Sequence, residues 1–162
     1  MQLQKAKSGL GAIATDCDVN RLTDSEWNEL SKAWLDSKVL VVRGQTLTID
    51  QFLAHSRRLG RLKPHRVRKT RHPEHPELTV MGVNIKTTDG KVDTSILQRG
   101  GDWHTDGPWD KEIVKATQLY ALEIPSVGGD TLFADMSAAC EALPRSLKGR
   151  IEPMRVEFAY GH

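Results

Sequence analysis

From residue 78 onward, the apolar residues of this chain fall in short runs that are separated by turn residues. Such runs, rich in β-branched side chains and bounded by Gly, Pro, Asn or Asp, are typical of strands. Strands are predicted over residues 78–83, 117–124, 131–134 and 154–160. Turns are predicted between them, at 87–91 and 125–130. Strands joined by turns and long loops, without regular helical crossovers, favour a mainly antiparallel sheet.

Helix signals fill the first third of the chain. Capping boxes at Thr23–Glu26 and Thr48–Gln51 each precede apolar residues at helical spacing, and Gly60 suits the end of the second helix. The apolar run 38–43 between them predicts a buried strand, and Asp135 is expected to cap a helix that ends before Pro144. The fold class is therefore mainly β with flanking helices (α+β), in a single domain over residues 1–162.

Composition places the chain among globular proteins. Hydrophobic residues make up 38% and charged residues 27%, and the formal net charge is only +2. That charge does not indicate a nucleic-acid partner, and no apolar run approaches the ~18 residues of a membrane span. Cys17 and Cys140 do not require a disulfide, and no secretory signal is visible, so we expect a cytoplasmic protein.

The stretch GDWHTDGPW at residues 101–109 carries the clearest chemistry. His104 and Asp106 are two residues apart, so on an extended strand their side chains point the same way and reach one metal ion. Two imidazoles and one carboxylate on one face of a ferrous ion leave positions for a co-substrate and dioxygen. The alternative is a loop histidine that hydrogen-bonds a nearby aspartate. The flanking Trp103 and Trp109 make the stretch unusual and favour a site.

Part of this stretch and two later segments appear in a particular order along the chain. They read WHTD at 103–106, LEIPSVGGDTLF at 122–133 and AACEALP at 138–144, and earlier stretches VRGQ at 42–45 and LGRL at 59–62 agree with them. From about Gly9 onward, this arrangement resembles the taurine dioxygenase / 2,4-dichlorophenoxyacetate dioxygenase family. The resemblance implies a double-stranded β-helix, or jelly roll, and an enzyme that uses Fe(II) and 2-oxoglutarate as co-substrate.

The resemblance also implies roles for individual residues. His104 and Asp106 match the family's first two iron ligands, and Thr131 matches a threonine that contacts 2-oxoglutarate. Three residues are candidates for substrate binding: His65, Trp103 and Gly100. Gly100 falls near a position where the taurine enzyme carries an asparagine, which argues against taurine as substrate. The alternatives are that Thr131 is an ordinary strand residue, that His65 is an exposed loop histidine, and that Trp103 only packs against its neighbours.

The family's remaining essential residues, a second iron-binding histidine and an arginine for 2-oxoglutarate, lie further downstream in members nearly twice this length. We therefore expect an apparently truncated, N-terminal part of such a domain. None of the other histidines is expected to complete the site: His55, His65, His72, His75 and His162. His72 and His75 are expected to be solvated. Half a jelly roll exposes strand edges, so a homo-oligomer or a second completing chain is an expected partner.

One run of basic residues, 61–72, has three interpretations: a solvated loop, a rim that attracts an anionic substrate, or a nucleic-acid site. The run has no aromatic residues for base stacking, which disfavours the last. The predicted function is an Fe(II)/2-oxoglutarate-dependent dioxygenase that hydroxylates a small organic anion. The alternatives are an inactive truncated family member acting as an interaction partner, and a basic binding module unrelated to oxygenases.

Overall fold

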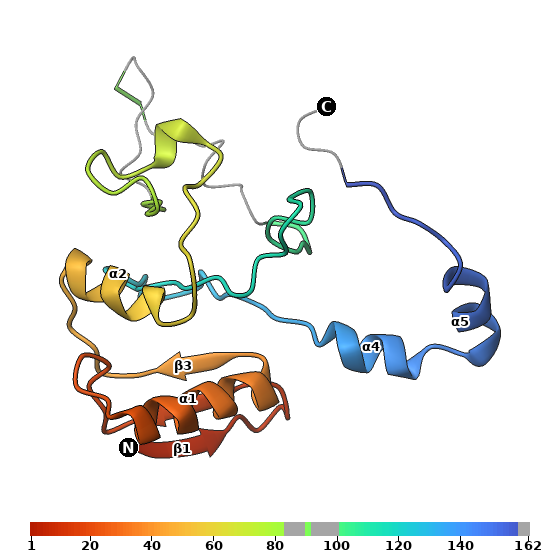
Figure 1. Cartoon of the computed structure of the whole chain (residues 1–162), viewed down its shortest axis with the longest axis horizontal. Coiled ribbons are helices and arrows are strands. Elements are labelled where there is room, and N and C mark those ends of the chain that lie inside the picture. Colours follow the sequence, from red (N-terminus) through yellow and green to blue (C-terminus); the bar gives the residue numbers. More distant parts are fainter. Residues whose placement is uncertain (83–89, 92–100, 159–162) are drawn as a thin grey trace. The chain divides into compact units, whose positions relative to one another are not determined.

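The computed structural model describes residues 1–82, 90–91 and 101–158 (Figure 1). The chain forms two compact units. The first unit comprises residues 1–55 and 119–157, and the second comprises residues 56–118 and 158–162. That residues 1–162 fold as one domain stays a prediction.

The first unit contains a three-stranded sheet in the order β1-β2-β3. The strands are β1 (Gln2–Lys5), β2 (Ala12–Thr15) and β3 (Leu40–Val42). β1 and β2 are antiparallel, whereas β2 and β3 are parallel. The helix α1 (Asp24–Ser37) connects the two parallel strands and packs against them (Figure 1). The strand predicted at 38–43 is thus confirmed as β3, but Val41 is 39% exposed, so the strand is not fully buried.

Both capping boxes of the sequence are formed. Thr23 Oγ1 accepts a hydrogen bond from the Glu26 N–H (3.3 Å), and Glu26 Oε2 accepts one from the Thr23 N–H (2.9 Å). The helix α2 (Ile49–Arg57) begins with the same exchange between Thr48 and Gln51. It ends at Arg57, before Gly60, so the predicted helices are confirmed in position.

The core of the first unit is small. Its buried apolar side chains come from β2, α1, α2 and the loop after β2: Ala12, Ala14, Val19, Leu30 and Leu53. Alternation along β2 places Ala12 and Ala14 inward. The hydroxyl of Tyr120 accepts a hydrogen bond from the Leu47 N–H (2.8 Å), and its ring lies 5.7 Å from that of Phe52. The chain near residue 120 is thereby attached to the start of α2.

The later part of the first unit holds α4 (Met136–Ala142) and α5 (Arg145–Ile151). Asp135 caps α4 by accepting hydrogen bonds from the N–H groups of Ser137 and Ala138, both at 3.0 Å. Lys38 Nζ lies 2.6 Å from the other carboxylate oxygen of Asp135, and this hydrogen-bonded lysine lowers the pKa of Asp135. The predicted helix after Asp135 is confirmed; α5 was not predicted.

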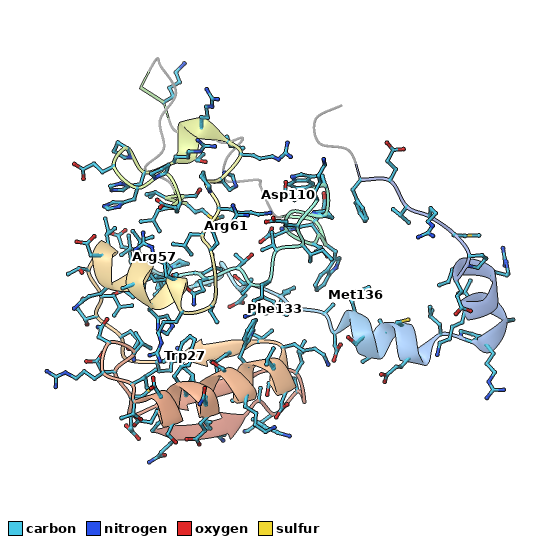
Figure 2. The ribbon with its side chains drawn as sticks, in the orientation of Figure 1. Trp27, Arg57, Arg61, Asp110, Phe133 and Met136 are labelled. Carbon is cyan, nitrogen blue, oxygen red and sulfur yellow. The ribbon has the colours of Figure 1, made fainter. Side chains whose placement is uncertain are left out.

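The strands predicted at 117–124 and 131–134, and at 154–158, are wrong: these residues have irregular backbone. A strand needs a partner for its backbone N–H and C=O groups, and the described residues provide none at these positions. Large apolar side chains there remain exposed, including Leu122, Ile124 and Phe133. Phe133 is labelled in Figure 2. Residues 159–160 of the last predicted strand lie outside the described residues.

The second unit consists mostly of loops, with one 3₁₀ turn, η1 (Arg68–Thr70). The strand predicted at 78–83 is reduced to a single antiparallel bridge between Arg71 and Thr79, and residue 83 is not described. Most of the turn predicted at 87–91 is likewise outside the described residues. A small sheet with helices agrees with the α+β class, but among the described residues more residues lie in helices than in strands, so the part described here is not mainly β. The double-stranded β-helix stays a prediction.

Two further expectations concern the cysteines and a membrane-spanning helix. Cys17, which is half-buried, and Cys140, which is exposed, are both free thiols, and burial raises the pKa of Cys17. Within the described part of the chain, no helix has the length and apolar character needed to cross a bilayer.

Candidate metal centre

The structure brings His104 and Asp106 together. His104 Nε2 lies 3.4 Å from Asp106 Oδ1, and the two side chains are 55% and 53% exposed. They sit on a loop, not on the strand end that the sequence predicted.

The ring of His104 is oriented by its own backbone. Nδ1 lies 2.8 Å from the Asp102 carbonyl oxygen. A carbonyl can only accept a hydrogen bond, so Nδ1 donates to it, and in the tautomer with its hydrogen on Nδ1 the Nε2 lone pair is available to a metal. Metal-binding histidines are commonly held this way, with one nitrogen donating to a carbonyl and the other facing the metal. The free nitrogen is the one that faces Asp106.

Asp106 is held by a residue that the sequence did not single out. Thr117 Oγ1 donates a hydrogen bond of 2.7 Å to Asp106 Oδ2, which leaves Oδ1 facing His104. Thr117 is eleven residues downstream. No local pattern connects the two positions, because the loop between them brings them together only in the fold.

The turn after Asp106 requires a glycine. Gly107 has a φ of +64°, and the Asp110 N–H donates to its carbonyl oxygen (3.1 Å). A Cβ at this position would lie 2.7 Å from Val114 Cγ2, closer than real contacts allow. Both the positive φ and this contact favour glycine, and together they fix the direction of the loop that carries the pair.

Three cations of the basic run 61–72 form ion pairs within the second unit. Arg61 Nη2 lies 2.5 Å from Glu112 Oε2, Lys63 Nζ lies 2.9 Å from the Glu112 carbonyl oxygen, and Arg66 Nη2 lies 3.1 Å from Asp110 Oδ1. Of these residues, Figure 2 labels Arg61 and Asp110. The hydrogen bond from Arg66, with that from Lys63, lowers the pKa of Asp110. These three cations therefore anchor the segment that follows the His104–Asp106 loop. Because they are paired, they are neither fully solvated nor free to bind a polyanion.

The other predicted site residues are more dispersed. His65 is exposed, and its Nδ1 accepts from the Val67 N–H (3.2 Å). Trp103 is 71% exposed, and its contact with substrate stays a prediction. Thr131 belongs to the first unit and is exposed on irregular backbone, not on a strand. Gly100 lies outside the described residues.

The donor atoms of His104 and Asp106 fit one divalent metal ion. Bonds from such an ion to imidazole nitrogen and carboxylate oxygen are roughly 2.0–2.2 Å long, so atoms 3.4 Å apart can bind the same ion. Among the described residues, however, no third His, Cys, Asp or Glu joins this pair. Within those residues, three side chains with ligand atoms close enough for one ion occur elsewhere, at His72, Glu74 and His75.

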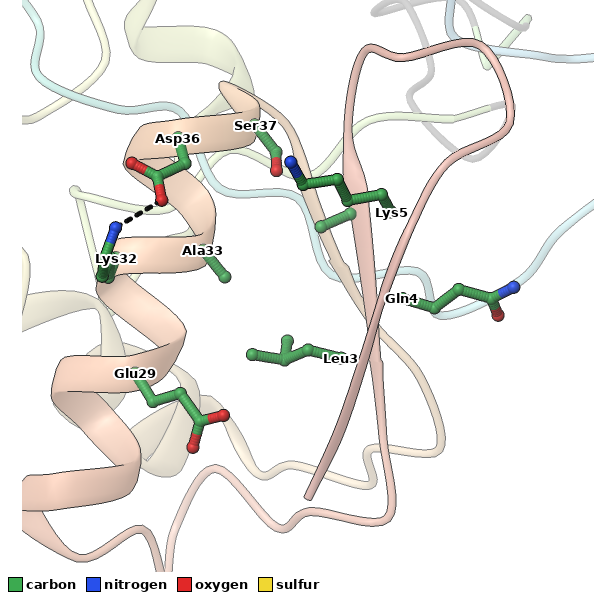
Figure 3. A pocket seen from close by; sticks show the side chains of 9 residues that line it. Leu3, Gln4, Lys5, Glu29, Lys32, Ala33, Asp36 and Ser37 are labelled. Carbon is green, nitrogen blue, oxygen red and sulfur yellow. Dashed lines mark hydrogen bonds and ion pairs between the residues drawn. The ribbon is translucent and has the colours of Figure 1, made fainter.

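The first unit has a groove between β1 and α1 (Figure 3). It is lined by Leu3, Lys5, Ala33 and Ser37, among others, and the Lys32–Asp36 ion pair of 2.6 Å lies at its side. None of the predicted site residues lines it, so this groove has no part in the candidate metal centre.

Comparison with known proteins agrees with the motif. Residues 2–162 match the family model described as taurine catabolism dioxygenase TauD, TfdA family. The chain is 34% identical to an (S)-phenoxypropionate/alpha-ketoglutarate-dioxygenase of Sphingobium herbicidovorans, over 92% of this chain and 50% of the relative. It is 32% identical to an alpha-ketoglutarate-dependent 2,4-dichlorophenoxyacetate dioxygenase of Cupriavidus pinatubonensis, over 84% and 50%.

A pentalenolactone F synthase of Streptomyces arenae is 34% identical, over 93% of this chain and 50% of its own length. These matches define a class of alpha-ketoglutarate-dependent dioxygenases. This chain belongs to the TauD/TfdA family. It spans about half the length of the curated relatives it matches.

Proposed function

We propose that this chain supplies the first two iron ligands, His104 and Asp106, of an Fe(II)- and 2-oxoglutarate-dependent dioxygenase. The observation that carries the proposal is the local geometry of the pair. The Asp102 carbonyl fixes the His104 ring so that its free nitrogen faces Asp106 at 3.4 Å. The family membership supports the same reaction type.

Each residue has a definite task in this proposal. His104 offers a neutral nitrogen, and Asp106 offers a negative oxygen that offsets part of the metal charge. Thr117 holds the aspartate in one orientation, so the two donor atoms need little reorganisation on binding. When bound, the iron supplies the oxidising chemistry, in which 2-oxoglutarate and dioxygen become succinate and carbon dioxide while a substrate C–H group becomes C–OH.

The site needs further residues. We propose that the second histidine and the 2-oxoglutarate arginine come from the part of the relatives' length that these 162 residues do not span. Thr131 is proposed to contact 2-oxoglutarate, and His65, Trp103 and Gly100 are proposed to contact substrate, in that completed assembly. Cytoplasmic location is part of the same proposal.

The substrate is proposed to be a small organic anion. Two relatives act on phenoxypropionate and dichlorophenoxyacetate, which are both carboxylates. The basic run contributes less to anion attraction than its sequence indicates, because Arg61, Lys63 and Arg66 are paired with acidic residues or a carbonyl. Recognition of the substrate charge is therefore expected to depend on other groups.

Anaerobic titration with Fe(II) and 2-oxoglutarate tests the ligand assignment. A 2-oxo acid chelated to ferrous iron gives a weak visible absorption band, which reports this site and not iron bound elsewhere. The test protein is a fusion of this chain with the half of a relative that the chain does not span; we call this fusion the completed enzyme. In it we expect a saturable band that His104→Ala and Asp106→Ala each abolish. Thr105→Val, inside the same motif, is the matched control and is expected to keep the band. An unchanged band in both ligand variants would overturn the assignment.

A further inference from the structure

A hairpin-like loop in the second unit presents His72, Glu74 and His75 on one short segment, HPEHP at 72–76. None of these residues belongs to the His104–Asp106 pair. His72 and His75 are half-buried, not fully solvated as the sequence indicated, and Glu74 is exposed. One ligand atom from each of the three lies within 4.8 Å of the other two.

The backbone of this loop is closed by hydrogen bonds on both sides of the cluster. The His72 N–H donates to the Leu78 carbonyl oxygen and the Leu78 N–H donates to the His75 carbonyl oxygen, both at 2.9 Å. The bridge between Arg71 and Thr79 continues the pairing. These bonds hold the two histidines at the end of the loop instead of leaving them on a mobile chain.

The base of the loop is anchored as well. Thr70 is 4% exposed, and its hydroxyl donates to the Val67 carbonyl oxygen (3.0 Å). Two prolines, Pro73 and Pro76, fix φ within the segment and so reduce the number of conformations that the unbound loop can adopt. A loop restricted in this way loses less conformational entropy when its side chains bind one ion.

The side chains are arranged for a shared ligand. The two imidazole rings have centroids 5.1 Å apart and are tilted by 40°, not stacked. His72 Nδ1 accepts a hydrogen bond from the Glu74 N–H (3.3 Å), which orients that ring. The neighbouring Glu77 is paired with Arg57 at 3.7 Å, so Glu74 is the carboxylate available to the cluster.

We propose that His72, Glu74 and His75 form a second metal site, which binds a divalent ion of the zinc class. Two imidazole nitrogens and one carboxylate oxygen are a donor set that Zn(II) accepts, with the remaining position left to water. The bound ion fastens the loop 71–79, and a ligand that binds only the folded state stabilises it. The site stands on the geometry of the loop and does not depend on the proposed dioxygenase function.

Zinc titration of the untagged, chelator-treated 162-residue chain tests this site, with bound metal measured after equilibrium dialysis. We expect one tightly bound zinc per chain. His72→Ala and His75→Ala should each weaken binding at least about tenfold, because two remaining ligands hold zinc poorly. Glu74→Gln, which keeps the shape of the side chain, should also weaken binding, whereas Glu77→Gln should not.

Two comparisons separate this site from the candidate iron site. His104→Ala should leave tight zinc binding unchanged, and His72→Ala should leave the Fe(II)/2-oxoglutarate band of the completed enzyme unchanged. Circular dichroism of each variant checks whether that variant is folded. Absence of tight zinc binding in the unmodified chain, or binding that survives both His72→Ala and His75→Ala, would overturn the proposal. If the completed enzyme without substitutions shows no iron band while zinc still binds tightly, that result contradicts only the dioxygenase assignment.

Discussion

At the scale of single residues, the orientation of two donor atoms defines the candidate iron site. The Asp102 carbonyl fixes the tautomer of His104, and the Thr117 hydroxyl fixes the carboxylate of Asp106. Neither supporting group binds metal in the proposed site. Both reduce the number of orientations that the ligands sample, which raises affinity without adding a bond to the ion.

Replacing Thr117 by valine should weaken Fe(II) binding in the completed enzyme by roughly 10–100-fold, the usual effect of losing such a supporting hydrogen bond. Valine keeps the size of the side chain but removes the donor to Asp106. The 2-oxoglutarate band, titrated against iron, measures the affinity. Thr117→Ser restores the hydroxyl and should restore most of the affinity; equal weakening by serine would point to packing instead of the hydrogen bond.

At the scale of elements, local sequence explains the helices well. The capping box of α1 and the cap of α4 satisfy backbone N–H groups that a helix leaves without partners at its start. These interactions involve residues two or three positions apart, so a short stretch of sequence is enough to predict them.

Removing the N-cap of α1 should lower the free energy of unfolding of the first unit. Thr23→Ala loses the acceptor for the Glu26 N–H, and such a loss costs about 1 kcal/mol. Urea denaturation followed by far-UV circular dichroism measures the change. Thr23→Ser keeps the hydroxyl and should behave like the unmodified chain. A stability unchanged by alanine would show that water replaces the cap without cost.

The ion pairs between the basic run and residues 110–112 should make the second unit sensitive to acid. Arg66 and Lys63 lower the folded-state pKa of Asp110 below its unfolded value of roughly 3.9. A lowered pKa means that this stabilisation is present above about pH 4 and is lost as the pH falls through the folded pKa. Thermal unfolding of the chain and of Asp110→Asn should therefore differ at pH 6 and converge towards pH 2; a constant difference would contradict the pairing.

At the scale of the whole molecule, a large amount of apolar surface is exposed. Leu122 and Ile124 are each 79% exposed and Phe133 is 54% exposed, along a segment whose strands were predicted but are not formed. Exposed apolar clusters of this kind mark surfaces that other protein segments cover. The chain spans about half the length of the curated relatives it matches.

We expect this surface to drive self-association of the 162-residue chain. Sedimentation velocity at increasing protein concentration should show a species larger than the 18.1 kDa monomer. The double substitution Leu122→Ser and Ile124→Ser removes two strongly exposed apolar side chains and should shift the equilibrium towards monomer. The surface substitution Glu123→Gln, between them, is the control; a monomer at all concentrations would contradict the expectation.

The sequence alone determined the features that depend on neighbours along the chain. The caps at Thr23, Thr48 and Asp135 predicted three helices correctly, and the spacing of His104 and Asp106 identified the pair of donors that the structure brings together. In both cases the interacting groups are two or three residues apart, so a short pattern carries the information.

Only the tertiary structure decided what depends on distant partners. Thr117 reaches Asp106, and the basic run pairs with residues 110–112. The predicted strands after residue 117 failed for the same reason. A β-branched run favours extended backbone, but it becomes a strand only when another segment pairs with it, and no such segment lies among the described residues.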